Sequence, residues 1–187
     1  MTRIASALLL IALVASCEGA PAAARRDGVR GAGGEERSRP LPPPLAAAAG
    51  MTLASPAFAD GAAIPAQYSC DGAGGSPPLV IAGVPAAARA LALLVEDPDA
   101  PSGTFTHWAV WNIPADARGV AAGARFEGAT EGENGFGNVG WGAPCPPRGT
   151  HRYLFRLIAL SAPVKDRDGI AAHAIAEARL LGRYSRR

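Results

Sequence analysis

Short apolar runs, each bounded by turn-forming residues, dominate the chain after residue 50. Residues 90–95, 106–113 and 151–160 have the length and composition of buried β-strands. Only residues 170–181, which are rich in alanine and closed by Gly182, have a helical pattern. The pattern therefore predicts a mostly β domain that ends in a helix. In the run over residues 151–160, the large side chains alternate between one face with Tyr153, Phe155 and Leu157 and another with Leu154, Ile158 and Leu160.

The first 17 residues have the features of an export signal. Thr2-Arg3 precedes an apolar run over residues 4–16, which is too short to span a bilayer. The run ends in Val14-Ala15-Ser16-Cys17, which resembles the lipobox of bacterial lipoproteins, where the cysteine becomes the lipidated first residue of the mature protein. An ordinary signal cleaved nearby is the alternative. We favour lipidation of Cys17, with several acyl chains anchoring the protein to a membrane of the bacterial cell envelope.

Residues 18–50 predict a tether between this signal and a folded domain. They are rich in Ala, Pro, Gly and Arg, with a proline run at 40–44, and show neither helical nor strand period. Too few large apolar side chains are present to fold, so we expect a disordered segment that the prolines partly stiffen. Residues 51–187 are long enough to form one core. They carry twelve basic and twelve acidic residues without a basic stripe, so we expect no nucleic-acid partner.

Two of the three histidines follow loops rich in proline and glycine. Asp97-Pro98-Asp99-Ala100-Pro101 leads to His107-Trp108, and a second loop over residues 142–150 leads to His151-Arg152-Tyr153. Proline restricts both its own backbone and the residue before it, so the first loop holds two carboxylates at little entropic cost. Polar side chains on stiff loops at strand ends are a common way for a β scaffold to form a pocket.

These residue types leave several kinds of chemistry open. Asp97 and Asp99 could cap backbone amides within a turn. His107 and His151 could be satisfied core histidines, or could bind a metal with Asp97, although neither H-x-x-x-H spacing nor a Cys/His cluster is present. The imidazoles could instead donate hydrogen bonds to an anion, with glycines around 142 and 149 letting backbone N–H groups approach it.

The two loops resemble those of the phosphatidylethanolamine-binding protein family, in its bacterial Raf-kinase-inhibitor-like branch. The shared motifs are D-P-D-A-P at residues 97–101, H-W at 107–108 and G-x-P-C-P-P-x-G-x-H-R-Y at 142–153. The similarity extends to residues 53–58, 76–79 and 181–184. Ala143 and Trp141 stand where the family usually has glycine and tyrosine. The resemblance implies an antiparallel β-sandwich with one or two C-terminal helices.

The resemblance also implies a small pocket for phosphate-like anions, such as phosphate or a phospholipid head group. Carried over by motif, Trp108 and Asp99 support the pocket, and a purely structural role for Asp99 is equally expected. His173 lies outside both motifs, and we expect it to be structural or exposed. The residues expected to line the pocket are Asp97, His107, Pro146, His151 and Tyr153.

The cysteine count adds a further expectation. If Cys17 is lipidated, Cys70 and Cys145 remain as an even pair in an exported, oxidising setting. We predict that they form a disulfide, which would fix the second pocket loop to an N-terminal loop. Two separate buried thiols are the alternative.

The functional expectation is a membrane-tethered, non-catalytic binding protein for a small anionic ligand. The chain has no G-x-S-x-G elbow, P-loop, H-E-x-x-H or dinucleotide-binding fingerprint, so we expect neither an enzyme nor a cofactor. Two alternatives stay open. The protein could inhibit or modulate another protein, such as a protease or kinase, through the same loops, or it could be a cryptic phosphoester hydrolase.

Lipidation of Cys17 is directly testable. Mass spectrometry of the mature N-terminus should find an acylated cysteine, because Cys17 directly follows small residues at the end of the apolar run. An unmodified N-terminus downstream of Cys17 would contradict the prediction.

Overall fold

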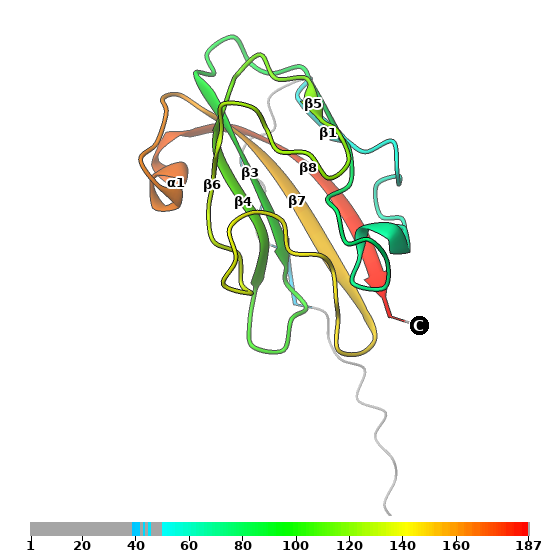
Figure 1. Ribbon diagram of the computed structural model, residues 1–187. Helices are drawn as coiled ribbons and strands as arrows, with labels where there is room; N and C mark the ends of the chain where they lie inside the picture. Colours follow the sequence, from blue (N-terminus) through cyan, green and yellow to red (C-terminus); the bar gives the residue numbers. More distant parts are fainter. Residues whose placement is uncertain (1–38, 42, 44, 46–49, 187) are drawn as a thin grey trace, which may run out of the picture. The chain divides into compact units, whose positions relative to one another are not determined.

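A computed structural model shows the chain as two antiparallel β-sheets packed face to face, and it describes residues 39–41, 43, 45 and 50–186. The smaller sheet has the order β1-β2-β5 and the larger sheet the order β6-β4-β3-β7-β8 (Figure 1). The strands are β1 (Thr52–Ala54), β2 (Leu79–Ala82), β3 (Ala90–Asp97), β4 (Phe105–Ile113), β5 (Gly119–Val120), β6 (Thr130–Glu131), β7 (Thr150–Leu160) and β8 (Ala174–Ser185). The helical elements are the 3-10 turns η1 (Ala66–Tyr68) and η2 (Arg167–Gly169) and the helix α1 (Ile170–His173). The expected antiparallel sandwich is confirmed.

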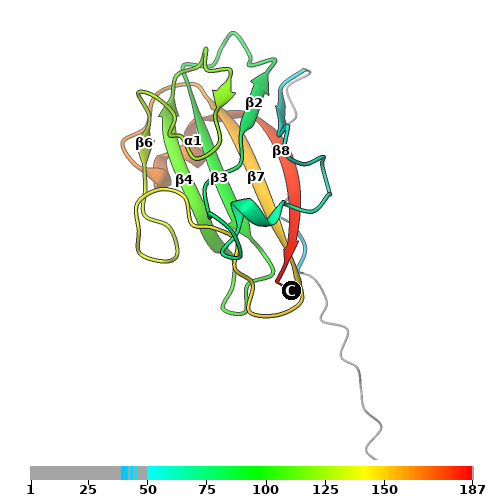
Figure 2. The same cartoon turned by 45° about the vertical axis from the view of Figure 1, so that its right-hand side comes forward.

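The main core lies between the two sheets, as the turned view in Figure 2 shows. Period-two alternation directs one set of side chains from each long strand toward the small sheet. From β3 these include Leu91, Leu93 and Val95, and they meet Leu53 and Ile81 of the small sheet in one buried cluster. We call this side of the large sheet its inner face, and the opposite side its outer face.

A second, smaller apolar cluster covers one end of the outer face. There Leu94 and Ile158 from the sheet pack with Val164 and Ile170 from the connection that contains η2 and α1. The alternation predicted for residues 151–160 is therefore confirmed. Phe155 and Leu157 belong to the inner cluster, whereas Ile158 and Leu160 belong to the outer one.

The helix predicted over residues 170–181 is wrong in its extent. The helix α1 ends at His173, and from Ala174 the chain runs as the twelve-residue strand β8, paired with β7 along its length. Ala176, Ala178 and Leu180 alternate inward in β8. Alanine favours helices, so this period of two is not recognisable in the sequence. Backbone pairing with β7 outweighs the local helix propensity.

Cys70 and Cys145 lie at disulfide distance, with sulfur atoms 2.12 Å apart and Cα atoms 5.4 Å apart. The backbone N–H of Cys70 also donates to the carbonyl of Pro144 at 3.0 Å. The loop that leads into β7 is thus fixed to the segment after η1, as the cysteine count predicted.

The predicted signal and lipidation site, residues 1–17, lie outside the described residues, as does most of the predicted tether. Within the described part of the chain, no helix has both the length and the apolar character needed to cross a membrane.

The cysteine pair generates a stability prediction. The double variant Cys70→Ser/Cys145→Ser should lose about 2–5 kcal/mol in free energy of unfolding, because a 75-residue separation is no longer closed in the unfolded chain. Urea denaturation of the oxidised wild type and the variant would measure the loss, with the reduced wild type as the matched control. Equal midpoints for all three would contradict the prediction.

Candidate functional site

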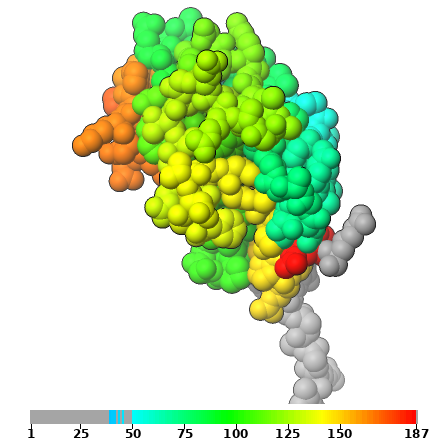
Figure 3. Space-filling view, in the orientation of Figure 1, coloured from blue at the N-terminus to red at the C-terminus, as the bar shows by residue number. Residues whose placement is uncertain are grey.

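A pocket of about 210 Å³ lies at one end of the inner face of the large sheet. It forms where β3 ends and where β4 and β7 begin, so antiparallel pairing brings three strand ends and their loops together. Figure 3 shows the loop after β3, in green, and the segment before β7, in yellow, at the lower end of the molecule. The pocket is lined by Asp97, Ala100, Pro101, Ser102, Phe105, His107, Phe136, Cys145, Pro146, Pro147, His151 and Tyr153.

A β-bulge in β4 places His107 in this pocket. Val95 pairs with Trp108, but the next residue, Glu96, pairs with Thr106, so His107 is an extra residue in β4. A bulge of this kind redirects a side chain and allows neighbouring residues to share one face. His107 therefore lines the pocket while Trp108 enters the inner core.

The imidazole of His107 is buried and held by its Nδ1 atom. Nδ1 lies 2.7 Å from the carbonyl oxygen of Gly142. A carbonyl only accepts hydrogen bonds, so Nδ1 carries the proton and donates. The rings of Phe105 and Tyr153 pack against the imidazole at centroid distances of 5.0 and 5.1 Å. Burial lowers the pKa of His107, and the bond to Gly142 and the charge of Asp97 only partly offset this effect.

His151 is held in the same way, but by a carboxylate. Its Nδ1 lies 2.7 Å from Oδ2 of Asp97, and both side chains are buried. The other carboxylate oxygen of Asp97 accepts the backbone N–H of Asp99 at 2.8 Å. Asp97 thus caps a backbone amide of its own loop and orients His151 at the same time. The turn-capping role and the pocket role, which the sequence leaves as alternatives, are therefore both present.

These bonds determine what the pocket presents to a ligand. Because both Nδ1 atoms already donate inward, a neutral His107 and a neutral His151 each keep only an Nε2 lone pair. The hydroxyl of Tyr153 is buried in the pocket wall without a hydrogen-bond partner among the described residues. Burial, aided by the charges of Asp97 and Asp99, raises the pKa of Tyr153 far above its usual range, so this group stays an O–H donor.

Two predicted site residues lie outside the pocket. Asp99 accepts three hydrogen bonds from Arg152: from its backbone N–H at 3.0 Å, from Nε at 2.8 Å and from Nη2 at 2.7 Å. It thereby fastens the loop after β3 to the start of β7. Trp108 donates from Nε1 to Glu131 at 2.9 Å and packs against Trp141 behind the pocket. Neither residue lines the pocket.

The predicted role of the glycines is not what the structure shows. The N–H of Gly142 donates to the carbonyl of His107 at 2.7 Å, so it is already used. A Cβ at Gly142 would lie 2.7 Å from the ring of Phe136, which explains the glycine by close packing. Gly149 has a φ of +66° with open space around it, so it serves the turn before β7.

Sequence reasoning missed the aromatic wall of the pocket. Phe105 and Phe136 pack edge to face at 4.7 Å and both line the pocket, while the Phe136 side chain is 52% exposed. Asn134 holds the Phe136 backbone through its side chain, in a turn that Asn134-Gly135 did mark. No periodic signal identifies Phe136, because it lies in a loop.

Within the described residues, no three His, Cys, Asp or Glu side chains gather in a possible metal site.

Comparison with known proteins identifies a family that covers nearly the whole domain. A family model described as phosphatidylethanolamine-binding protein matches residues 54–185. The chain belongs to the phosphatidylethanolamine-binding protein family. A UPF0098 protein of Methanothermobacter thermautotrophicus is 43% identical over 150 residues, which cover 73% of this chain and 99% of that protein.

Two further members of the family are informative. A crystal structure of a phosphatidylethanolamine-binding protein homologue from Chlamydia trachomatis has a TM-score of 0.70 and 39% identity, covering 73% of this chain and 98% of that one. A Mycobacterium tuberculosis protein that carries the name lipoprotein LppC is 40% identical over 178 residues, covering 84% of this chain and 88% of that protein. Membership of this family makes the protein a binding protein.

The arrangement of His107 yields a prediction for the free protein. Nitrogen-15 NMR should find the neutral imidazole protonated at Nδ1, and the pKa of His107 should lie below the ordinary value of about 6.5. Burial is the cause, since the charged form loses hydration that the bond to Gly142 does not replace. A neutral ring protonated at Nε2, or a pKa at or above 6.5, would contradict this account.

Proposed function

We propose that this member of the phosphatidylethanolamine-binding protein family is a membrane-tethered, non-catalytic binding protein whose pocket takes a phosphate-like anion. The observation that carries the proposal is the buried hydroxyl of Tyr153, which has no partner among the described residues and lies in a pocket with two oriented histidines. An unpaired buried hydroxyl costs about 1–3 kcal/mol in the free protein, and a bound oxyanion would relieve this cost.

The size of the pocket favours a small group. Its volume of about 210 Å³ lies below the roughly 300–1,000 Å³ typical of pockets for drug-sized ligands. Prolines and aromatic rings make up much of the walls, with Asp97, Ser102, His107, His151 and Tyr153 as the polar groups. A phosphate or a phosphorylated head group matches both this size and the few convergent polar atoms.

The protonation state of the pocket determines how an anion would bind. With both histidines neutral, Tyr153 supplies an O–H donor, while the two Nε2 atoms can only accept. A fully deprotonated phosphate also can only accept hydrogen bonds, so it would form none with the two Nε2 atoms. Binding therefore requires one additional proton, either on an Nε2 atom or on the phosphate, where a P–O–H group would donate to that nitrogen.

The hydrogen bonds of Asp97 argue against this carboxylate as a general base. Both carboxylate oxygens already accept hydrogen bonds, one from His151 and one from the Asp99 backbone. A general base must reach the proton that it abstracts, and this carboxylate is instead used to hold its loop and to orient an imidazole. The tether is supported by the lipobox-like sequence at Cys17 and by the name of the LppC relative.

Calorimetry with inorganic phosphate tests the pocket. His107→Ala should weaken binding by about 1.5–3 kcal/mol, roughly 10- to 150-fold in Kd, because a hydrogen bond to a charged group is lost. Wild-type affinity should rise as pH falls, by about tenfold per pH unit where one proton is taken up. If Nε2 of His107 takes up this proton, the rise should continue below pH 6.5, since the pKa of His107 is lowered.

Two variants control this experiment. His173→Ala removes the histidine on α1, at the end of the sheet away from the pocket, and should leave the Kd unchanged. Asp97→Asn should weaken binding less than His107→Ala, because it disturbs the orientation of His151 without removing a ligand group. Equal affinity of wild type and His107→Ala would make His107 structural. A requirement for added zinc would replace the anion pocket by a metal site.

A further inference from the structure

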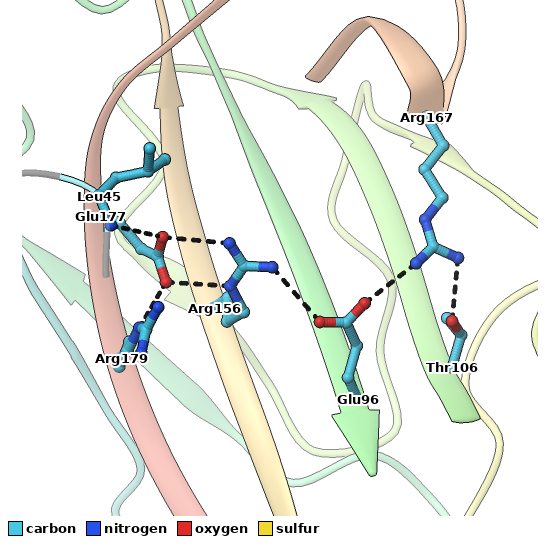
Figure 4. A network of polar contacts seen from close by, with 7 residues as sticks. All are labelled: Leu45, Glu96, Thr106, Arg156, Arg167, Glu177 and Arg179. Atoms are coloured by element: carbon cyan, nitrogen blue, oxygen red, sulfur yellow. Dashed lines mark hydrogen bonds and ion pairs between the residues drawn. The ribbon is translucent and has the colours of Figure 1, made fainter. Parts of the chain in front are cut away.

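The outer face of the large sheet carries a chain of ion pairs that the pocket does not use. Figure 4 shows a chain of alternating charge that crosses β8, β7 and β3 and ends on η2: Arg179, Glu177, Arg156, Glu96 and Arg167. Glu177 joins two arginines, accepting from Arg156 at 3.0 and 3.2 Å and from Arg179 at 2.5 Å.

Strand register explains why the network is needed. Arg156 on β7 lies directly opposite Arg179 on β8, an unfavourable pair of like charges. Glu177 is the diagonal neighbour that satisfies both. Its own side chain is fully buried, and burial by itself would raise its pKa. The hydrogen bonds from Arg156 and Arg179 together outweigh burial and lower the pKa of Glu177, so the carboxylate stays charged.

Residues that precede the domain contact this network. The backbone N–H of Leu45 donates to Oε2 of Glu177 at 3.4 Å, as Figure 4 shows. Six residues earlier, Arg39 donates from its guanidinium to the carbonyl of Pro98 at 3.2 Å. The carbonyl of Arg39 accepts from the guanidinium of Arg152. These bonds fix the segment at two places, one on β8 and one beside the pocket loop.

Next to Arg39, Pro40 lies at a hollow in the outer face of the sheet. Pro40 forms one wall of a cavity of about 390 Å³, whose other walls include Glu96, Leu154 and Arg156 of the outer face. The described residues of this stretch are Arg39, Pro40, Leu41, Pro43 and Leu45, and we call them the strap. A proline-rich chain loses little backbone entropy on docking because it is already extended.

The direction of the strap has a consequence for the pocket. Leu45 is bound to Glu177 near the start of β8, whereas Arg39 is bound to Pro98 and Arg152, next to Asp97 and His151 of the pocket. Arg39, the first described residue, therefore lies at the pocket end of the domain. The half-exposed ring of Phe136 lies at the same end, on the pocket wall.

We propose that the strap docks on the outer face of the sheet and thereby makes the pocket end, with Phe136, the face that contacts a lipid surface. The proposal rests on the membrane tether proposed above. Arg39 follows Cys17 by only 22 positions in the sequence. The end of the domain at which Arg39 lies is therefore joined to the anchor by the shortest length of chain, which favours contact of that end with the surface.

Two tryptophan reporters test the orientation. Phe136→Trp places the reporter at the pocket, and Ile175→Trp places it at the start of β8, at the far end of the sheet, where the native side chain is 40% exposed. Each chain would be coupled through Cys17 to a maleimide lipid in vesicles of phosphatidylcholine brominated in its acyl chains. We expect quenching beyond the wild-type baseline for Phe136→Trp and none for Ile175→Trp. Equal quenching of the two, or quenching of neither, would overturn the proposal.

A second pair of variants tests the strap itself. Arg39→Ala/Leu45→Pro removes the guanidinium donor and the N–H that bind Pro98 and Glu177. Arg39→Lys/Leu45→Ala keeps a donor at both positions and is the matched control. In the Phe136→Trp background, the first pair should reduce the quenching at least twofold and the second should not. Undiminished quenching with Arg39→Ala/Leu45→Pro would show that the strap does not set the orientation.

Hydrogen exchange of the Leu45 amide gives an independent reading of docking in the wild type. We expect slowed exchange, because that N–H is bonded to buried Glu177, and exchange at the unprotected rate would overturn the docked strap. Failure of the orientation is distinguishable from failure of the pocket. Phosphate binding by calorimetry with no reporter quenching would reject only the orientation, whereas absence of phosphate binding would reject the pocket itself.

Discussion

The two-residue period of β7 is the constraint on which the rest of the structure depends. Its side chains point alternately to the two sides of the large sheet, so one strand serves two environments. His151 and Tyr153 enter the pocket, while Arg152 and Arg156 bond to carboxylates on Asp99, Glu96 and Glu177. A register slip of one residue would place arginines in the core and histidines among the ion pairs. The pairings with β3 and β8 on either side keep the register fixed.

The sequence predicted the parts of the site that lie in rigid loop motifs. Asp97, His107, Pro146, His151 and Tyr153 were placed in one pocket by the two motifs, and the structure brings all five together. What the motifs could not show was the hydrogen-bonding state of each group. The bond from His107 to Gly142 depends on a β-bulge, and a bulge leaves no period or composition in the sequence to detect.

Two other differences between the predicted and the observed structure have a shared cause. The sequence predicts a helix over residues 170–181 because alanine favours helices, and the pairing of β8 with β7 overrides this propensity. Phe136 was missed because a loop residue gains its role from three-dimensional neighbours. A local hydrophobic pattern in the sequence identifies strands and helices whose buried side chains recur with a regular period. Positions that depend on a partner distant in sequence need the structure, and the bond between Leu45 and Glu177, 132 positions apart, is an extreme example.

Cys145 belongs to the wall of the pocket as well as to the cysteine pair. The bond to Cys70 therefore holds one wall of the pocket. In a compartment that keeps thiols reduced, the loop before β7 would depend on weaker contacts such as the hydrogen bond between Cys70 and Pro144. Reduction of this pair would therefore loosen one wall of the pocket in addition to lowering the stability of the domain.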